Sequence, residues 1–132
     1  MAGYVLGIDQ STQGTKALLF DKAGKLLCRA DLPHRQIVNE KGWVEHDPEE
    51  IYQNTVGVVK LLVEQSGIDR REIRVLGISN QRETALVWDR ATGRPVYNAI
   101  VWQCARGAAI CEEIKQQKDA ENIRSHTGLQ LS

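Results

Sequence analysis

The sequence predicts an α/β fold that begins with a three-stranded antiparallel meander and continues with helices and further strands. Three short apolar runs, at residues 4–9, 15–21 and 26–34, are joined by turns too short for a helical crossover. Residues 48–66 instead place apolar side chains at helical spacing. Neighbouring strands joined by short turns pair antiparallel, and the helix then needs a sheet face to cover its apolar side.

The first helix has recognisable ends. Asp47 is a good N-cap, Pro48 suits the first helical position, and Glu50 is predicted to complete a capping box. Gly67 is predicted to end the helix. Its buried face is expected to carry Ile51, Thr55, Val58, Val59, Leu62 and Ser66.

The second half of the chain alternates strands and helices. In order, we expect a connection at 35–46, a short polar turn at 69–72, a buried strand at 74–79, a hairpin from 84–89 and 96–102, and helices at 104–117 and 119–126. Gly128 is predicted to end the last helix.

Composition excludes several functional classes. Seventeen basic and seventeen acidic side chains balance, so no basic face points to nucleic acid. No stretch is long and apolar enough to span a membrane. The first four residues lack the pattern of a signal peptide, which predicts a cytoplasmic location.

The cysteines and histidines give no metal or disulfide signal. Cys28, Cys104 and Cys111 are too few and too scattered for a disulfide framework, and the last two are expected to share a helix face as core thiols. His34, His46 and His126 are widely separated, and each is interpreted as a surface or capping residue.

Arg82 and Glu83 follow an apolar run, at the position where ligands bind in open α/β sheets. An arginine offers a fixed fork of donors, and a glutamate offers acceptors. Hydroxyls both donate and accept, so this pair suits a hydroxyl-rich ligand. The alternative is a structural ion pair that closes the strand.

The turn at residues 10–14 is rich in hydroxyl and amide groups and follows Asp9. Backbone N–H groups and threonine hydroxyls in such a turn bind phosphate, an acidic residue holds Mg²⁺ through water, and Lys16 neutralises phosphate charge. The alternative is an ordinary β-turn. The turn is neither a Walker loop nor a dinucleotide-binding glycine motif.

The meander with an acidic strand end resembles the actin-like ATPase (ribonuclease H-like) domain of sugar kinases, actin and heat-shock ATPases. Residues 42–48, 80–84, 97–104 and 123–129 further resemble the FGGY carbohydrate kinases, and among them the members that phosphorylate glycerol. The resemblance covers essentially the whole chain.

The resemblance implies ATP and Mg²⁺ as cofactors and roles for seven residues. Asp9 would lie near the metal and the transferred phosphate. Thr12, Gln13 and Lys16 would face the ATP phosphates. Arg82 and Glu83 would bind polyol hydroxyls, and the indole of Trp102 would lie against the carbon backbone of the substrate. These residues come from both halves of the chain.

Three positions depart from the family pattern. Ser11 stands where a glycine is usual, and Gly14 where a serine is usual. A side chain at position 11 is expected to crowd the turn or a phosphate, and Gly14 to supply flexibility in return. After Cys104, Ala105 and Arg106 replace a pair of arginines.

The resemblance also implies that residues 1–132 are the first part of an N-terminal kinase domain, with the C-terminal domain absent and the general base beyond Ser132. The whole enzyme would convert glycerol and ATP to glycerol 3-phosphate, and the 132 residues alone would be inactive. The alternatives are an FGGY kinase for another polyol or sugar, and a non-catalytic domain that binds a polyol or a protein. Whether the whole enzyme forms a homo-oligomer stays open.

Overall fold

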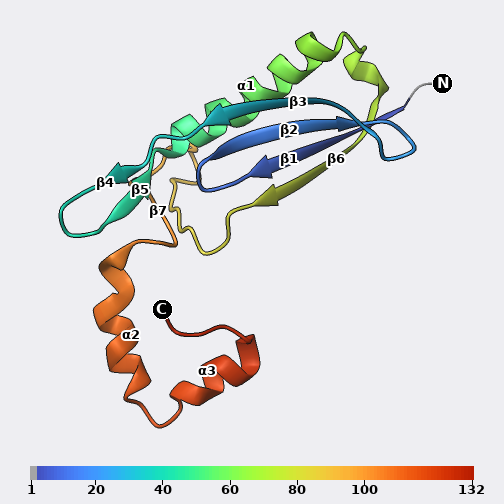
Figure 1. Cartoon of the computed structure of the whole chain (residues 1–132). Helices are drawn as coiled ribbons and strands as arrows, with labels where there is room; N and C mark the ends of the chain where they lie inside the picture. The colour runs from blue at the N-terminus through green and yellow to red at the C-terminus, as the bar shows by residue number, and fades with distance from the viewer. Residues whose placement is uncertain (1–2) are drawn as a thin grey trace.

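A computed structural model describes residues 3–132 (Figure 1). Met1 and Ala2, part of the segment used for the signal-peptide expectation, lie outside the described residues. The elements, in order, are β1 (Tyr4–Gln10), β2 (Gly14–Phe20), β3 (Leu26–Pro33), β4 (Ile37–Val38), β5 (Val44–His46), α1 (Pro48–Ser66), η1 (Arg70–Glu72), β6 (Ile73–Asn80), β7 (Ala99–Ile100), η2 (Ala105–Gly107), α2 (Ala108–Lys115) and α3 (Ala120–Thr127).

The main sheet has the strand order β3-β2-β1-β6. The predicted meander is confirmed, because β1 pairs antiparallel with β2 and β2 pairs antiparallel with β3. Strand β6 adds to the other side of β1 in parallel, with Asp9 opposite Ser79 and Gln10 opposite Asn80. The chain therefore crosses from β3 to β6 through α1, as parallel pairing requires.

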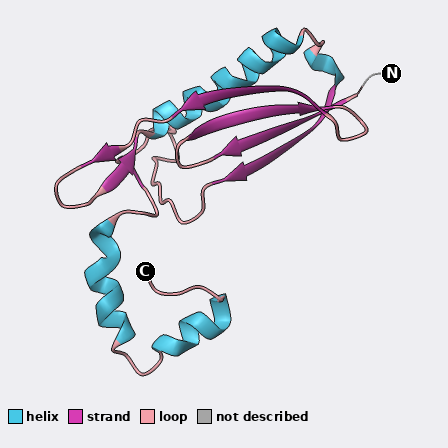
Figure 2. Cartoon of the chain, in the orientation of Figure 1, coloured by secondary structure: helices cyan, strands magenta, loops and turns pink. Residues whose placement is uncertain are grey.

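Helix α1 covers one face of the meander (Figure 2). Its fully buried Val58 and Leu62 pack on side chains from the three meander strands: Leu6, Ile8, Ala17, Leu19 and Ala30. Each large apolar side chain buried in this way contributes about 1.5–3 kcal/mol relative to exposure. This interface holds the meander rigid beneath the strand ends.

The predicted ends of α1 are largely confirmed. The Asp47 carboxylate accepts a hydrogen bond from the backbone N–H of Glu49, and Gly67 ends the helix in the left-handed conformation at φ 67°. The predicted capping box is wrong, because the Glu50 carboxylate accepts from the backbone N–H of Arg35. Glu50 thus connects the segment after β3 to α1 by a hydrogen bond and does not complete the N-terminal cap of the helix.

Strand β6 was predicted as buried, and this is wrong for the described residues. It is an edge strand with one neighbour, β1, and α1 packs mainly on β2 and β3. Side chains along β6 are consequently exposed, Ile78 by 62%. The apolar run correctly predicted a strand, but the periodicity carries no information on which elements cover it.

A second, smaller sheet has the order β4-β5-β7. The sequence predicted only a connection where β4 and β5 lie. The predicted hairpin is present: Ala85 and Ile100 exchange two backbone hydrogen bonds of 2.9 Å, and the N–H of Val96 donates to the carbonyl of Val87. Ile100 also lies opposite Glu45, which joins the hairpin to β5.

The helix predicted at 104–117 is broken into the short turn η2 and α2. Cys104 precedes η2 in an extended conformation, so it does not share a helix face with Cys111. All three cysteines are free and half-buried. Helix α3 ends at Gly128 with φ 73°, as predicted. Across residues 3–132, none of the helices is long and apolar enough to cross a membrane.

Candidate active site

The carboxyl ends of β1 and β6 lie side by side, and the candidate site is built on them. Parallel pairing continues one residue past β6, because the backbone N–H of Gln81 donates to the carbonyl of Gln10 at 2.7 Å. Asp9 and the segment containing Arg82 and Glu83 therefore leave the sheet at the same edge. This is the edge at which open α/β sheets bind ligands.

The chain turns sharply where β6 ends. Glu83 has a φ of 62°, the only positive value among non-glycine residues 3–132. Adjacent strand residues point to opposite faces, but this turn lets both Arg82 and Glu83 line one cleft. Within residues 3–132 the two side chains form no ion pair with each other, so the alternative of a structural ion pair is wrong.

The hairpin brings Trp102 to the same place. Since Ala85 lies opposite Ile100, the residues just beyond the pair, Glu83 and Trp102, come together at the open end. A cleft of about 540 Å³ results, lined by Asp9, Ser11, Thr12, Ser79, Asn80, Gln81, Arg82, Glu83 and Trp102. Trp102 is 52% exposed, so its indole forms a wall of the cleft and is not part of the core.

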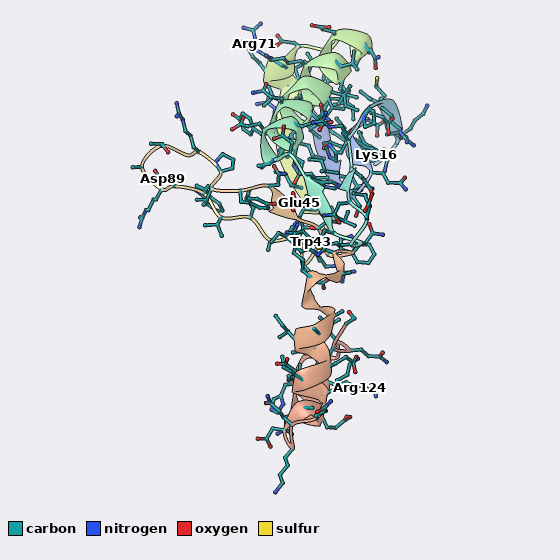
Figure 3. The ribbon with its side chains drawn as sticks, turned by 90° about the vertical axis from the view of Figure 1, so that its left-hand side faces the viewer. Lys16, Trp43, Glu45, Arg71, Asp89 and Arg124 are labelled. Atoms are coloured by element: carbon teal, nitrogen blue, oxygen red, sulfur yellow. The ribbon has the colours of Figure 1, made fainter. Side chains whose placement is uncertain are left out.

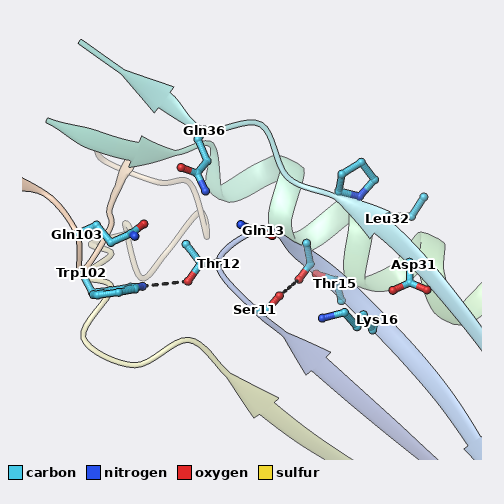
Figure 4. A pocket seen from close by; sticks show the side chains of 12 residues that line it. Ser11, Thr12, Gln13, Thr15, Lys16, Asp31, Leu32, Gln36, Trp102 and Gln103 are labelled. Carbon is cyan, nitrogen blue, oxygen red and sulfur yellow. Dashed lines mark hydrogen bonds between the residues drawn. The ribbon is translucent and has the colours of Figure 1, made fainter. Parts of the chain in front are cut away.

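A second cleft of about 630 Å³ adjoins the first. Its lining is Ser11, Thr12, Gln13, Gly14, Thr15, Lys16, Asp31, Leu32, Pro33, Gln36, Trp102 and Gln103. Trp102 and Thr12 border both clefts, and the indole N–H donates to the threonine hydroxyl at 2.9 Å (Figure 4). The two expected groups of residues therefore meet at one contact, with the phosphate-facing group mainly on one side and the polyol-facing group on the other.

The turn between β1 and β2 accommodates its departures from the family pattern. Ser11 does not crowd the turn: its hydroxyl and its backbone N–H both donate to the carbonyl of Gly14, at 2.8 and 2.9 Å. Gly14 is required by space and not by flexibility. A Cβ there would lie 2.6 Å from the carbonyl oxygen of Leu32 and 3.1 Å from the Cα of Pro33.

Asp9 and Lys16 form a cross-strand pair at the mouth of the clefts. They lie opposite each other in the β1–β2 register, with Lys16 Nζ 3.5 Å from Asp9 Oδ2. Both side chains are more than a third exposed, so the pair is weak and both groups stay available to a ligand. Lys16 lines the second cleft and Asp9 lines the first.

Two histidines interpreted as surface or capping residues are buried, and that interpretation is wrong for them. His34 is 8% exposed and His46 is fully buried, with their ring centroids 5.9 Å apart. Burial lowers the pKa of both imidazoles, and for His46 the neighbouring His34 lowers the pKa further while Glu50 opposes both effects. His34 lies 3.0 Å from the Thr15 hydroxyl. His126 is exposed.

A buried carboxylate anchors the segment that follows Trp102. Glu45 accepts from the Tyr97 hydroxyl at 2.9 Å, from the Asn98 amide at 2.8 Å and from the guanidinium of Arg106. That guanidinium also lies 4.1 Å from the ring centroid of Trp43. Figure 3 shows Trp43 and Glu45 above the start of the last two helices. Arg106, the one arginine kept after Cys104, is therefore a structural residue.

Sequence reasoning gave no role to two further residues at the site, Gln81 and Thr84. Both lie within the 80–84 segment and are half-buried beside the cleft. The Thr84 hydroxyl donates to the Gln81 side-chain oxygen at 3.0 Å. Their only signal in the sequence was their position on either side of Arg82 and Glu83.

Comparisons with known proteins agree with this arrangement. The chain is 52% identical over 126 residues to glycerol kinase 1 of Thermotoga maritima, covering 96% of this chain and 26% of the relative. It is similar to the crystal structure of Plasmodium falciparum glycerol kinase with ADP, with a TM-score of 0.85 and 35% identity over 99% of this chain and 26% of that one. It is also similar to a xyloylose kinase from Brucella ovis, with a TM-score of 0.83 and 27% identity over 96% of this chain and 26% of that one.

The fold is therefore the actin-like α/β fold that the sequence predicted. The chain spans about a quarter of the length of the curated relatives it matches. Residues 4–132 match the N-terminal domain of the FGGY family of carbohydrate kinases, and the chain belongs to that family.

Proposed function

We propose that this chain supplies the polyol-binding and phosphate-facing residues of an ATP-dependent kinase that converts glycerol to glycerol 3-phosphate. One observation carries the proposal: Arg82, Glu83 and Trp102, from two separate segments, line one cleft together with Asp9. The likeness to glycerol kinases at about half identity supports glycerol over other substrates.

The polyol would lie between charge and indole. The Arg82 guanidinium donates to hydroxyl oxygens and the Glu83 carboxylate accepts hydroxyl protons, so a vicinal diol satisfies both side chains. The Trp102 indole covers the carbon side of the substrate and excludes water from it. Because its N–H is committed to Thr12, the indole is held in a fixed orientation before the substrate arrives.

The ATP phosphates would lie against the turn between β1 and β2. Backbone N–H groups, the Thr12 hydroxyl and the side chain of Gln13 donate to phosphate oxygens, and Lys16 neutralises their charge. Asp9 fits a site for Mg²⁺. One carboxylate at the cleft suits an ion whose other ligands are water and phosphate oxygens. Such an ion supplies charge neutralisation at the phosphates.

The reaction forms a bond between a terminal hydroxyl oxygen of glycerol and the γ-phosphorus, and breaks the bond between that phosphorus and the oxygen of the ADP leaving group. The hydroxyl proton passes to a carboxylate base that the family resemblance places outside residues 1–132. The contribution of this chain is to position both reactants, and ideal positioning lowers a barrier by up to about 7–11 kcal/mol.

A hybrid enzyme tests the proposal. This chain would replace the matching quarter of Thermotoga maritima glycerol kinase 1, and ADP release would be followed with glycerol, xylulose or gluconate. We expect turnover with glycerol, and none from the 132-residue chain alone, which serves as the control. A folded hybrid that uses only xylulose or gluconate would assign this chain to another sugar kinase. A folded hybrid without any turnover would contradict the proposal and favour a non-catalytic binding domain.

A further inference from the structure

The side-chain amide of Gln81 lies between a buried histidine and the loop that carries the polyol-facing pair. Its nitrogen is 3.3 Å from His46 Nδ1, and its oxygen accepts from the Thr84 hydroxyl at 3.0 Å. The backbone N–H of Gln81 donates to the carbonyl of Gln10. Gln81 is thereby fixed at its backbone by β1 and at its side chain by two different segments.

Thr84 extends this connection to Trp102. The hydroxyl of Thr84 accepts from the backbone N–H of Trp102 at 3.3 Å while it donates to Gln81. The hydrogen bond between Gln81 and Thr84 joins the residues on either side of Arg82 and Glu83, and we call it the 81–84 bracket. One amide therefore holds the two segments that border the cleft, the turn with Arg82 and Glu83 and the hairpin end with Trp102.

The turn needs such a bracket. Glu83 has a φ of 62°, a conformation that costs a non-glycine residue about 1–2 kcal/mol. A strained residue keeps its conformation only where the surroundings hold it. The side chain of Glu83 is exposed and its backbone has no place in a strand, so the restraint comes from the flanking residues Gln81 and Thr84.

The directions of these hydrogen bonds determine the form of His46. Thr84 donates its only hydroxyl proton to the Gln81 oxygen, which leaves the Gln81 NH₂ group facing His46 Nδ1. With the amide in this orientation Nδ1 accepts, and the proton of a neutral imidazole resides on Nε2. His46 Nε2 is buried without a hydrogen-bond partner within residues 3–132. A protonated Nδ1 would place its N–H against the Gln81 NH₂ group, donor against donor, and would drive the amide to flip.

We propose that Gln81 is a positioning residue for the polyol cleft, and that neutral His46 fixes the orientation of its amide. The effect of Gln81 on catalysis rests on the proposed polyol site. The hydrogen bonds between Gln81, Thr84 and His46 do not depend on that proposal. Three hydrogen bonds then hold Arg82 and Glu83 in one geometry. The backbone N–H of Trp102 donates to Thr84, the Thr84 hydroxyl donates to Gln81, and the Gln81 amide donates to His46.

The structural part is tested on the 132-residue chain by ¹⁵N NMR of the imidazole nitrogens near neutral pH. We expect His46 as the Nε2–H tautomer. In Gln81→Glu a carboxylate replaces the donor, so Nδ1 should gain a proton while Thr84 keeps its acceptor. Gln65→Glu, an exposed change on α1, should leave the imidazole unchanged. An Nδ1–H tautomer in the unmodified chain, or no change in Gln81→Glu, would overturn the inference.

The catalytic part is tested in the hybrid enzyme. Gln81→Leu and Thr84→Val should each raise the KM for glycerol by about tenfold with the KM for ATP within about twofold, as expected for one or two lost hydrogen bonds. Thr84→Ser retains the hydroxyl and should restore the glycerol KM. Equal effects on both substrates, or no rescue by serine, would overturn the positioning role. An inactive unmodified hybrid would count against the proposed function instead, and the NMR result would still decide the structural part.

Discussion

The indole N–H of Trp102 donates to the hydroxyl of Thr12 at 2.9 Å across ninety positions of the chain. This contact joins the end of the hairpin to the turn between β1 and β2. Trp102 and Thr12 line both clefts, so the contact lies between the cleft that we propose for the polyol and the cleft that we propose for the phosphates. A phosphoryl group passing from one cleft to the other would cross beside this pair.

Removing the acceptor at position 12 should release the indole. In Thr12→Val we expect the Trp102 indole N–H resonance of the 132-residue chain to move and its exchange with solvent to quicken, because the exposed indole keeps no other partner for its N–H. The indoles of Trp43 and Trp88 serve as internal references. Thr12→Ser retains the hydroxyl and should leave the resonance near its original position. An unmoved resonance in Thr12→Val would contradict the contact.

Adding a methyl group at Gly14 should destabilise the fold. A Cβ would lie 2.6 Å from the Leu32 carbonyl oxygen, and β3 backbone cannot move away without breaking its ladder with β2. We expect Gly14→Ala to lower the free energy of unfolding by about 1–3 kcal/mol in urea titrations. The matched control is Gly77→Ala in β6, where a Cβ meets nothing within 4 Å. Equal stability of the two variants would contradict the crowding.

The carboxylate of Glu45 should be essential to the small sheet. Glu45 is 7% exposed and holds three donors, one of them the Arg106 guanidinium. Glu45→Gln removes the charge that the guanidinium faces, and breaking buried pairs costs on the order of 3 kcal/mol. We expect Glu45→Gln to lower the free energy of unfolding by about 3 kcal/mol. The control Glu64→Gln, on the exposed side of α1, should change it little. A similar stability for both variants would show that Arg106 finds another partner.

The buried histidines should make stability depend on pH. The folded pKa of His34 and of His46 lies below the ordinary 6.5, so the unfolded chain binds more protons. Stability is fully present above that value and falls as the pH drops below it, by up to about 1.4 kcal/mol per pH unit for each imidazole. Urea titrations from about pH 7.5 to 5.5 measure this. His34→Gln should reduce the slope by at least half, because it also removes the neighbour that lowers the pKa of His46. An unchanged slope would contradict the assignment.

The range from about pH 7.5 to 5.5 separates the titration of the histidines from that of the carboxylates. The pKa values of Asp31, Asp69 and Asp89 are also lowered, mainly by hydrogen bonds from Arg29, Arg71 and Thr92 respectively. Their stabilisation is present above the ordinary value of 3.8 and is lost only as the pH falls toward and below it. A slope above pH 5.5 therefore reports on the imidazoles.

Local patterns predicted the meander, α1 and α3 because each is determined by neighbours in sequence. Alternating burial, short turns and the caps at Asp47 and Gly67 act within a few residues. The exposure of β6 and the burial of His46 depend on which distant elements pack against them. Periodicity does not carry that information.

The candidate site shows the same division. Strand-end positions and the family resemblance identified five candidate residues that line one cleft: Asp9, Thr12, Arg82, Glu83 and Trp102. The sequence did not predict the hydrogen bond between Gln81 and Thr84, the residues before and after the charged pair. This hydrogen bond and those beside it need a hairpin register and a buried imidazole that only the folded chain defines.

The central claim is that the cleft beside β6 binds a polyol, and Glu83→Ala in the hybrid enzyme tests it most directly. Measured kcat/KM for glycerol should fall by about 10- to 100-fold, because hydrogen bonds to a charged group contribute about 1.5–3 kcal/mol, while the KM for ATP stays within about twofold. Unchanged kcat/KM for glycerol, or an equal loss in the use of ATP, would contradict the account.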